Sequence, residues 1–333
     1  MAIIQRDLEI TQLYDLVMAR ESIFLHAPSG MGKTHTIQAL FRKLEGRRIC
    51  FYLSARGMLS NEQLLLGLEQ SVRQVASRHS NVEYQLKRFF EEHPMPAGEA
   101  VQPINDWFEC LLVAIQNISQ DFLFVIEDLD QWEGESSPSE LFGKFFGSRN
   151  SQLLMSANGF NPAFEGNATP FELPQLQLSN FTEINSHESE TNAKSLLKFT
   201  RGNTAFVLDL LQNKNPADIK LQSHINKVMA IYQPAFYTFR KRFTDLQWRL
   251  LKAIANEDKV LQPHSFEFLM NYRLGAASSV ERALKNLADT GMIIRTEEGW
   301  QIENVVLQRW LQWLYSNRGQ NQSGGSILRS LVA

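Results

Sequence analysis

The chain has 333 residues, of which 44% are hydrophobic and 21% charged. This composition excludes a disordered or collagen-like chain, and at about 100–200 residues per domain we expect two or three domains. The longest apolar runs, such as Phe122–Ile126, are far shorter than the ~20 residues of a membrane-spanning helix, and we identify no signal peptide. We therefore expect a cytoplasmic protein without membrane contact.

The net charge of −3 gives no sign of a global basic coat for nucleic acids, although it is compatible with a local basic patch. The two cysteines, Cys50 and Cys110, exclude a disulfide framework and an all-cysteine metal site. Both lie in apolar stretches, which predicts buried free thiols.

Predicted strands and helices alternate along the first half of the chain. Helices are expected over Asp7–Ala19, Lys33–Leu44, Asn61–Val75 and Ile104–Ser119, and strands over Ser22–His26, Arg47–Leu53, Phe122–Ile126 and Gln152–Met155. This alternation predicts an α/β fold with a parallel sheet. Five consecutive apolar residues at 122–126 are typical of a strand that is covered on both faces.

The strand patterns end near residue 179, and the rest of the chain is predominantly helical in pattern. The helical pattern of residues 180–235 predicts an all-α segment. Three amphipathic helices follow, over Phe243–Ala255, Ser265–Tyr272 and Ala277–Thr290, and then a hairpin over Met292–Ile302. The tail 317–333 begins with NRGQNQSGGS and is expected to be flexible.

Residues Ala27–Thr34 read APSGMGKT and fit the phosphate-loop consensus G-x-x-x-x-G-K-[ST], except that Ala27 replaces the first glycine. Gly30 and Gly32 allow backbone N–H groups to turn inward, and a helix that begins near Lys33 directs its positive dipole end at phosphates. Lys33 is expected to reach the β- and γ-phosphates of ATP, and the Thr34 hydroxyl to bind Mg²⁺. An ordinary glycine-rich turn does not explain Lys-Thr at the helix start. The predicted nucleotide-binding residues are Ala27, Pro28, Ser29, Gly30, Met31, Gly32, Lys33, Thr34 and His35.

Two acidic residues, Glu127 and Asp128, directly follow the apolar run at 122–126. A phosphate loop needs a carboxylate at the end of a second strand to hold Mg²⁺. We expect Glu127 to hold the ion, directly or through water, although its side chain is one methylene longer than that of the usual aspartate. Asp128 is the candidate for the residue that orients the attacking water. The alternative is a solvated acidic turn after a strand.

These motifs, in this order, resemble those of the archaeal-type ATPases of the STAND group in the AAA+ superfamily. The resemblance covers nearly the whole chain and includes Arg6 and Glu9 before the loop, VIEDLD at 125–130, MSAN at 155–158 and TRGNTAFV at 200–207. Its most distinctive part lies in the C-terminal region, from LLKAIANEDKVLQPHSFEFL to LGAASSVERALKNLADTGMI. It implies a P-loop ATPase core over residues 1–179, a helical lid over 180–235 and a winged-helix domain over 236–316.

The resemblance also implies roles for single residues. Ser156 or Asn158 falls at the sensor-1 position, where a polar side chain contacts the γ-phosphate or positions water, although a polar strand end explains both equally well. Gly202–Thr204 falls where the family usually has Gly-x-Pro at the lid. Arg149 and Arg201 are the candidate arginine fingers, and each can also be an ordinary surface cation.

A winged helix can read a DNA major groove with its third helix. The charges of that helix cancel here, and the nearby basic cluster consists of Arg240, Lys241, Arg242, Arg249 and Lys252. DNA binding is therefore left open but is not favoured over packing on the ATPase core, a protein partner or self-association. Trp248, Trp310 and Trp313 are candidates for the apolar surface of such a contact.

Two functions fit these observations. The first is an ATPase that hydrolyses ATP to ADP and phosphate and acts as a nucleotide-driven conformational switch. The second is a nucleotide-gated DNA-binding regulator or scaffold with little turnover, which the unusual Glu127 and the missing arginine finger favour. A small-molecule kinase fits less well, because no substrate lid with paired arginines follows the loop.

Overall fold

The computed structural model describes residues 4–93, 121–133, 150–160, 168–182, 187–212 and 221–318, with scattered residues between 103 and 120. Contacts separate the chain into two compact units, Arg6–Pro174 and Gln175–Ala333, the latter joined by Met1–Gln5. The finer division into core, lid and winged helix stays a prediction. None of the helices in the described ranges combines the length and the apolar character needed to cross a lipid bilayer.

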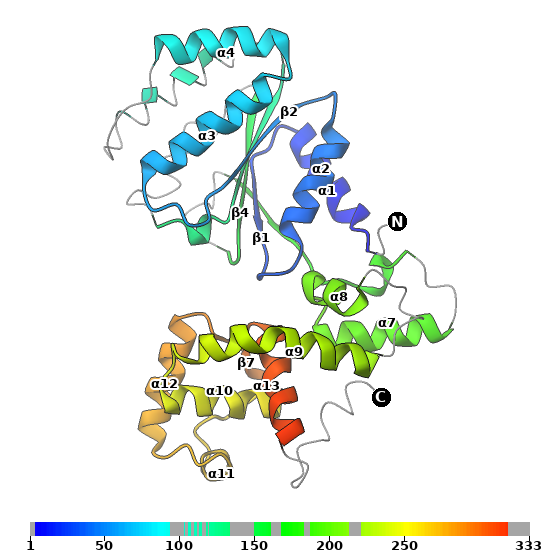
Figure 1. Cartoon of the computed structure of the whole chain (residues 1–333), viewed down its shortest axis with the longest axis vertical. Coiled ribbons are helices and arrows are strands. Elements are labelled where there is room, and N and C mark those ends of the chain that lie inside the picture. The colour runs from blue at the N-terminus through cyan, green and yellow to red at the C-terminus, as the bar shows by residue number, and fades with distance from the viewer. Residues whose placement is uncertain are drawn as a thin grey trace. The chain divides into compact units, whose positions relative to one another are not determined.

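A parallel sheet with the strand order β2-β3-β4-β1-β5 forms the centre of the Arg6–Pro174 unit (Figure 1). Its strands are β1 (Ile23–His26), β2 (Ile49–Ser54), β3 (Phe122–Glu127), β4 (Ser151–Ala157) and β5 (Thr169–Glu172). The expected α/β class with a parallel sheet is confirmed. The sequence pattern does not reveal β5, because this edge strand is half exposed and contains Pro170, a residue that sheets tolerate at an edge.

Helices cover both faces of this sheet (Figure 1). They are α1 (Asp7–Met18), α2 (Lys33–Leu44), α3 (Asn61–Ala76) and α4 (Ser80–Glu92). In β1, Ile23 and Leu25 share a hydrophobic core with α1 and α2, whereas Phe24 shares the other core with α3 and α4. Such alternation is what a strand between two helical layers requires. The expected helix Ile104–Ser119 lies largely outside the described residues.

Both cysteines are free, as expected, but they are not both buried. Cys50 is partly buried in β2, where burial raises the pKa of its thiol to about 12. Cys110 is exposed, whereas its helical neighbour Leu111 is fully buried. Consecutive residues of a helix point about 100° apart, so an apolar neighbourhood in the sequence does not bury each of its members.

The second unit is predominantly helical, with one antiparallel hairpin. Its elements are α7 (His187–Thr200), α8 (Thr204–Leu211), α9 (Leu221–Arg240), α10 (Asp245–Glu257), α11 (Phe266–Asn271), α12 (Ala277–Asp289), β6 (Ile293–Thr296), β7 (Gly299–Ile302) and α13 (Val305–Arg318). Three helices and a hairpin, from α10 to β7, give the predicted winged helix. One hydrophobic core joins α7, α8 and α9 to these elements and to α13.

The tryptophans expected on an interaction surface are mostly inside this core. Trp248 and Trp310 are only 7% and 0% exposed, and Trp310 packs against Phe236 and Tyr237 of α9. Trp313 is partly buried and donates a hydrogen bond to Asn226 of α9. The prediction was therefore wrong for Trp248 and Trp310, because α9 covers the side of the winged helix to which they belong.

Gly202 and Asn203 shape the turn between α7 and α8. Gly202 has a φ of 65°, and a Cβ added there would lie 2.7 Å from the carbonyl oxygen of Leu176. Asn203 is the N-cap of α8, and its side chain accepts a hydrogen bond from the Phe206 N–H. Thr204 is the first residue of α8, a position where a proline is also well suited. The change from Gly-x-Pro to Gly-Asn-Thr is therefore compatible with the same turn.

A polar cluster joins the α7–α8 turn to the winged helix. The Oδ1 atom of Asp258 accepts hydrogen bonds from Arg309 and Gln308, both at 2.8 Å, and from Arg201 at 3.2 Å. Arg201 also donates to the carbonyl oxygen of Ile302 at 3.2 Å. Arg309 is only 1% exposed, so its charge depends on this carboxylate. Burial favours a higher pKa for Asp258, but Arg309 and Arg201 outweigh it and hold that pKa below its ordinary value.

We expect Asp258→Asn to destabilise the chain by about 3 kcal/mol at pH 7, because it leaves the buried Arg309 without a counter-charge. Since folding lowers the pKa of Asp258, the stabilisation is present above the unfolded-state pKa of about 4 and is lost as the pH falls through the folded-state pKa. Urea unfolding between pH 7 and pH 3 measures both effects. The variant should lose less stability on acidification than the parent chain, whereas Asp289→Asn, at an exposed position of α12, should behave like the parent. If the free energy of unfolding fell equally with pH in the parent chain, Asp258→Asn and Asp289→Asn, this explanation would be wrong.

Candidate functional site

The APSGMGKT motif forms the connection from β1 to α2, which is the strand–loop–helix context that a phosphate loop requires. Gly30 and Gly32 have φ values of 80° and 93°, in the left-handed region that glycine adopts without strain. Gly32 is the N-cap of α2 and brings no capping side chain, so the first N–H groups of the helix face the loop uncovered by a cap. Ala27 is buried, and its N–H donates to the Ala157 carbonyl oxygen at 3.4 Å.

Lys33 is folded over the loop and is only 7% exposed. Its Nζ atom donates to the carbonyl oxygens of Ala27 at 2.7 Å and Pro28 at 3.4 Å, and to Oδ1 of Asn158 at 2.9 Å. The ammonium group therefore lies between the loop and the end of β4. An anionic ligand in the loop would meet this charge in a largely desolvated setting, where electrostatic attraction is strong.

Arg6, the N-cap residue of α1, contacts the loop through its side chain. Its guanidinium donates to the Met31 carbonyl oxygen at 2.9 Å, to the Pro174 carbonyl oxygen at 3.0 Å and to Glu9 at 3.0 Å. Both Arg6 and Glu9 are buried. The sequence pattern pairs these two residues, but their contact with the loop depends on the tertiary structure.

Thr34 and Glu127, the two predicted Mg²⁺ ligands, are in direct contact. The Thr34 hydroxyl donates to Oε1 of Glu127 at 2.6 Å, and the Tyr52 hydroxyl donates to Oε2 at 2.6 Å. The longer side chain of glutamate therefore reaches the threonine. Hydroxyl and carboxylate oxygens suit Mg²⁺, which takes its remaining ligands from water and phosphate. Among the described residues, no group of three or more His, Cys, Asp or Glu side chains is placed to hold a metal ion.

Asp128 follows β3 in a left-handed conformation, with a φ of 61°, and begins a short 3₁₀ helix, η1 (Leu129–Gln131). This conformation is uncommon for a residue other than glycine, although aspartate and asparagine tolerate it best. The carboxylate accepts a hydrogen bond from the Ser54 hydroxyl at 3.0 Å and lies 3.4 Å from Nε of Arg56. Asp128 and Glu127 therefore have different partners, although they are neighbours in the sequence.

The two sensor-1 candidates differ in position. Asn158 contacts Lys33, and Asp130 holds it in place by accepting from its backbone N–H at 2.9 Å and from Nδ2 at 2.6 Å. Ser156 is fully buried in β4, and its hydroxyl has no hydrogen-bond partner within the part of the chain that the structure describes. Only Asn158 is therefore brought to the phosphate loop.

Of the remaining predicted residues, Pro28 contributes its carbonyl oxygen, which accepts from Lys33 at 3.4 Å. Pro28, Ser29 and His35 are exposed on the loop or the first turn of α2. Arg201 is engaged in the Asp258 cluster of the second unit, and Arg149 lies outside the described residues. Tyr52, Ser54 and Arg56 contact Glu127 or Asp128, and the sequence did not single them out. Tyr52 and Ser54 lie on β2, the strand next to β3, and Arg56 follows it, so finding them requires the strand order.

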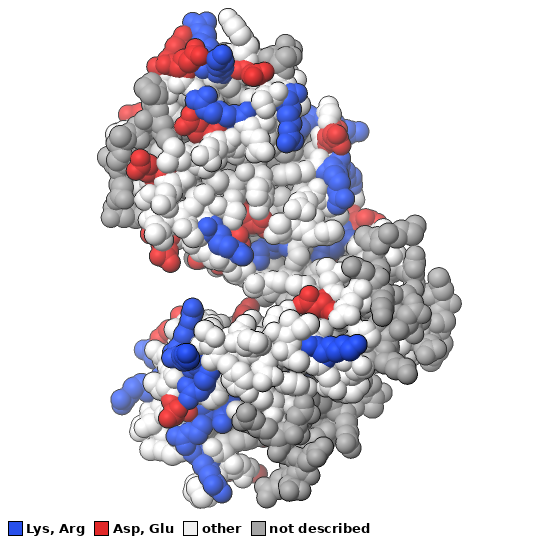
Figure 2. Space-filling view, viewed as in Figure 1, with Lys and Arg blue, Asp and Glu red and all other residues white. Residues whose placement is uncertain are grey.

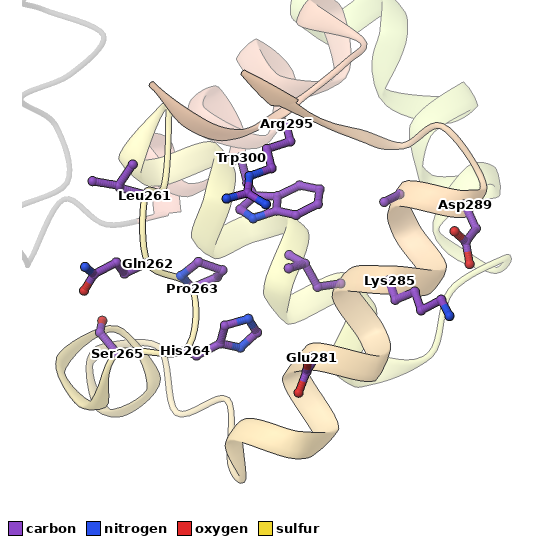
Figure 3. Close-up of a pocket in the computed structure, with 12 residues that line it drawn as sticks. Leu261, Gln262, Pro263, His264, Ser265, Glu281, Lys285, Asp289, Arg295 and Trp300 are labelled. Carbon is purple, nitrogen blue, oxygen red and sulfur yellow. The ribbon is translucent and has the colours of Figure 1, made fainter. Parts of the chain in front are cut away.

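A cavity of about 830 Å³ lies in the winged helix, between α12, the hairpin and residues 261–265 (Figure 3). Trp300 and Pro263 line its apolar part, and the cation–π pair of Arg295 with Trp300 closes one side. The side chains of Glu281, Lys285 and Asp289 lie along α12 at its edge (Figure 3). Two acidic and two basic residues line the cavity, so its charge selects neither an anionic nor a cationic ligand.

Two family models match the chain. Residues 2–155 match an AAA ATPase domain, and residues 234–313 match a probable winged helix domain. No curated protein is significantly similar in sequence. The expected combination of a P-loop ATPase domain of the AAA+ type with a C-terminal winged helix is confirmed, whereas membership of the STAND group stays a prediction.

Solved structures of other proteins resemble this chain to different degrees. A Walker-type ATPase of Pyrococcus abyssi is 14% identical, with a TM-score of 0.59, and the match covers 93% of this chain and 96% of that one. The Orc1 protein of Aeropyrum pernix in complex with DNA is 13% identical over 94% of this chain and 93% of that one, with a TM-score of 0.43. The RuvB branch migration motor of Thermotoga maritima is 12% identical over 90% and 92%, with a TM-score of 0.40. Only the first of these supports an argument about the fold of the whole chain.

Proposed function

Because residues 2–155 belong to the AAA ATPase family and residues 234–313 form a winged helix domain, we propose that this protein binds ATP-Mg²⁺ and hydrolyses it as a conformational switch. The observation that carries the proposal is the convergence of Lys33, Thr34, Glu127 and Asn158 at the end of β1, β3 and β4. Four residues from three segments of the sequence meet there.

In this proposal, each side chain has a separate task. The backbone N–H groups after Gly30 and the ammonium of Lys33 hold phosphate oxygens, and Asn158 orients Lys33. Thr34 and Glu127 hold Mg²⁺, which when bound neutralises charge that develops on the phosphate oxygens. Asp128 accepts a proton from the attacking water or orients it, once Ser54 and Arg56 release its oxygens.

The second unit supports the switch. Its lid helices α7, α8 and α9 share a hydrophobic core with the winged helix, and the Asp258 cluster ties the α7–α8 turn to it. We propose that these helices and the winged helix respond to nucleotide as one body. Two-state elements of this kind respond to a ligand only if it binds the two states differently.

Hydrogen exchange tests the switch. We expect a non-hydrolysable ATP analogue with Mg²⁺ to change amide protection in residues 187–212 and 221–318, as well as in the loop at 27–34, relative to ADP. Lys33→Ala should remove this difference. Protection that changes only at 27–34 would leave a nucleotide-binding protein without the proposed switch.

The runner-up, a nucleotide-gated DNA-binding regulator, is favoured by one observation. Lysine and arginine side chains gather on the surface over the winged helix (Figure 2). The exposed lysines and arginines between residues 241 and 285, here called the basic surface, are Lys241, Arg242, Arg249, Arg273, Arg282 and Lys285. Arg249 donates to the carbonyl oxygen of Arg273 at 2.9 Å, so positions distant in the sequence meet in it.

We expect this basic surface to bind duplex DNA weakly and without sequence preference. The affinity should fall steeply with salt, with a slope of about −0.9 for each phosphate contacted, because binding releases counterions. The whole chain should be titrated, since α9 supplies part of the core of the winged helix. Lys241→Ala with Arg242→Ala should weaken binding, whereas Lys227→Ala, at an exposed position of α9, should not. Nanomolar, salt-tolerant binding to one sequence would instead make the regulator the first candidate.

A further inference from the structure

The Glu127 carboxylate is held at both of its oxygens. Thr34 donates to Oε1 and Tyr52 to Oε2, each at 2.6 Å, and the carboxylate-bearing residue is only 2% exposed. Thr34 is part of the phosphate loop, but Tyr52 belongs to no motif of the sequence. Its contact with Glu127 is made between two neighbouring strands.

The sheet register explains how Tyr52 reaches Glu127. Ser54 pairs with Glu127 and Tyr52 with Val125, so Tyr52 lies two positions before the residue directly opposite Glu127. Residues two apart on a strand face the same side, and the long phenol spans this diagonal. On that side the ring packs edge-to-face against Phe41 of α2, with the centroids 6.4 Å apart. Tyr52 is 38% exposed, and this ring contact together with the hydrogen bond to Glu127 orients its hydroxyl.

A glutamate at this position needs such a support more than an aspartate does. It has one more rotatable bond, and fixing it for a metal ion costs more conformational entropy. Hydrogen bonds at both oxygens restrict rotation of the carboxylate more than the bond from Thr34 alone would. A phenol is protonated at neutral pH, so the Tyr52 hydroxyl can donate to this carboxylate.

We propose that Tyr52 is a positioning residue for Mg²⁺, whose hydroxyl holds Oε2 of Glu127 so that Oε1 and the Thr34 hydroxyl face the ion together. Tyr52 in this way adapts the metal site to glutamate in place of aspartate. The inference rests on the proposed function, because it assumes that Mg²⁺-nucleotide binds at Thr34 and Glu127.

The test is Tyr52→Phe in the whole chain, because phenylalanine keeps the contact with Phe41 and removes only the hydroxyl. ATP binding is measured by calorimetry over a range of Mg²⁺ concentrations and in EDTA. We expect the Mg²⁺ concentration for half-maximal binding to rise about tenfold, as for the loss of one hydrogen bond to a charged group. The affinity for metal-free ATP should stay at the parent value. Tyr84→Phe, at an exposed position of α4, should change neither quantity.

A double-mutant cycle shows whether Tyr52 acts through Glu127. Glu127→Asp shortens the side chain by one methylene and takes the carboxylate away from the phenol. Adding Tyr52→Phe to Glu127→Asp should then have no further effect on the Mg²⁺ requirement, whereas independent roles would give additive effects. Additivity would overturn the proposal.

The other outcomes are also decisive. If Tyr52→Phe needs no more Mg²⁺ than the parent chain, the positioning role is wrong and the nucleotide site stands. If it loses affinity equally with Mg²⁺ and in EDTA, Tyr52 supports the loop as a whole and not the metal. If the parent chain itself shows no Mg²⁺-dependent ATP binding, the proposed function fails, and this is recognised without any variant.

Discussion

Lys33→Ala is expected to weaken ATP-Mg²⁺ binding at least about a hundredfold. The ammonium is nearly buried and is held at the phosphate loop by Ala27 and Asn158, so it would meet phosphate oxygens in a desolvated site. A hydrogen bond to a charged group contributes about 1.5–3 kcal/mol, and a lysine that reaches two phosphates makes more than one. Calorimetric titration with ATP-Mg²⁺ measures the loss.

Lys43→Ala is the matched control for this variant. Lys43 lies on the same helix, is exposed and donates to the Thr11 hydroxyl, but it is ten residues, or about 15 Å, further along α2. It should bind ATP like the parent chain. Circular dichroism should show that both variants keep their helix content. Equal affinity of Lys33→Ala and the parent chain would remove the nucleotide site from the phosphate loop.

Asp128→Asn is expected to bind ATP-Mg²⁺ normally and to lose its turnover. Positioned general bases contribute about 10²–10⁴-fold to rates, and the amide of asparagine cannot take a proton from water. Asparagine tolerates the left-handed backbone of position 128, with its φ of 61°, so the fold should survive. Phosphate release under saturating ATP measures the rate, and calorimetry measures the binding.

The neighbouring glutamate provides the comparison. Glu127→Gln should impair the Mg²⁺ dependence of binding as well as the turnover, because Glu127 contacts Thr34 and Asp128 does not. If Asp128→Asn hydrolysed ATP at the wild-type rate, Asp128 would not be the catalytic residue, and Glu127 would be the next candidate. A parent chain that binds ATP but shows no turnover would favour the nucleotide-gated regulator.

Local chemistry made the strand–loop–helix geometry of the APSGMGKT segment predictable. A glycine at positions with positive φ, a lysine and a hydroxyl at a helix start leave few other interpretations, and the strand–loop–helix context was visible from periodicity alone. The same holds for Glu127 and Asp128, which lie at the carboxyl end of the fully buried strand β3. The short edge strand β5 has no such periodicity, so the sequence did not reveal it.

The sequence by itself determined the parallel α/β sheet and the winged helix, and it singled out the candidate phosphate loop and the two carboxylates, because each depends on residues that are close together along the chain. Only the tertiary structure decided that Asn158 and not Ser156 contacts Lys33, and that Tyr52 and Ser54 hold different carboxylates. It also decided that Trp248 and Trp310 are core residues. These outcomes depend on strand order and on which helix covers which face. Those arrangements are set by the packing of segments that lie far apart in the sequence, so they cannot be predicted from local sequence patterns.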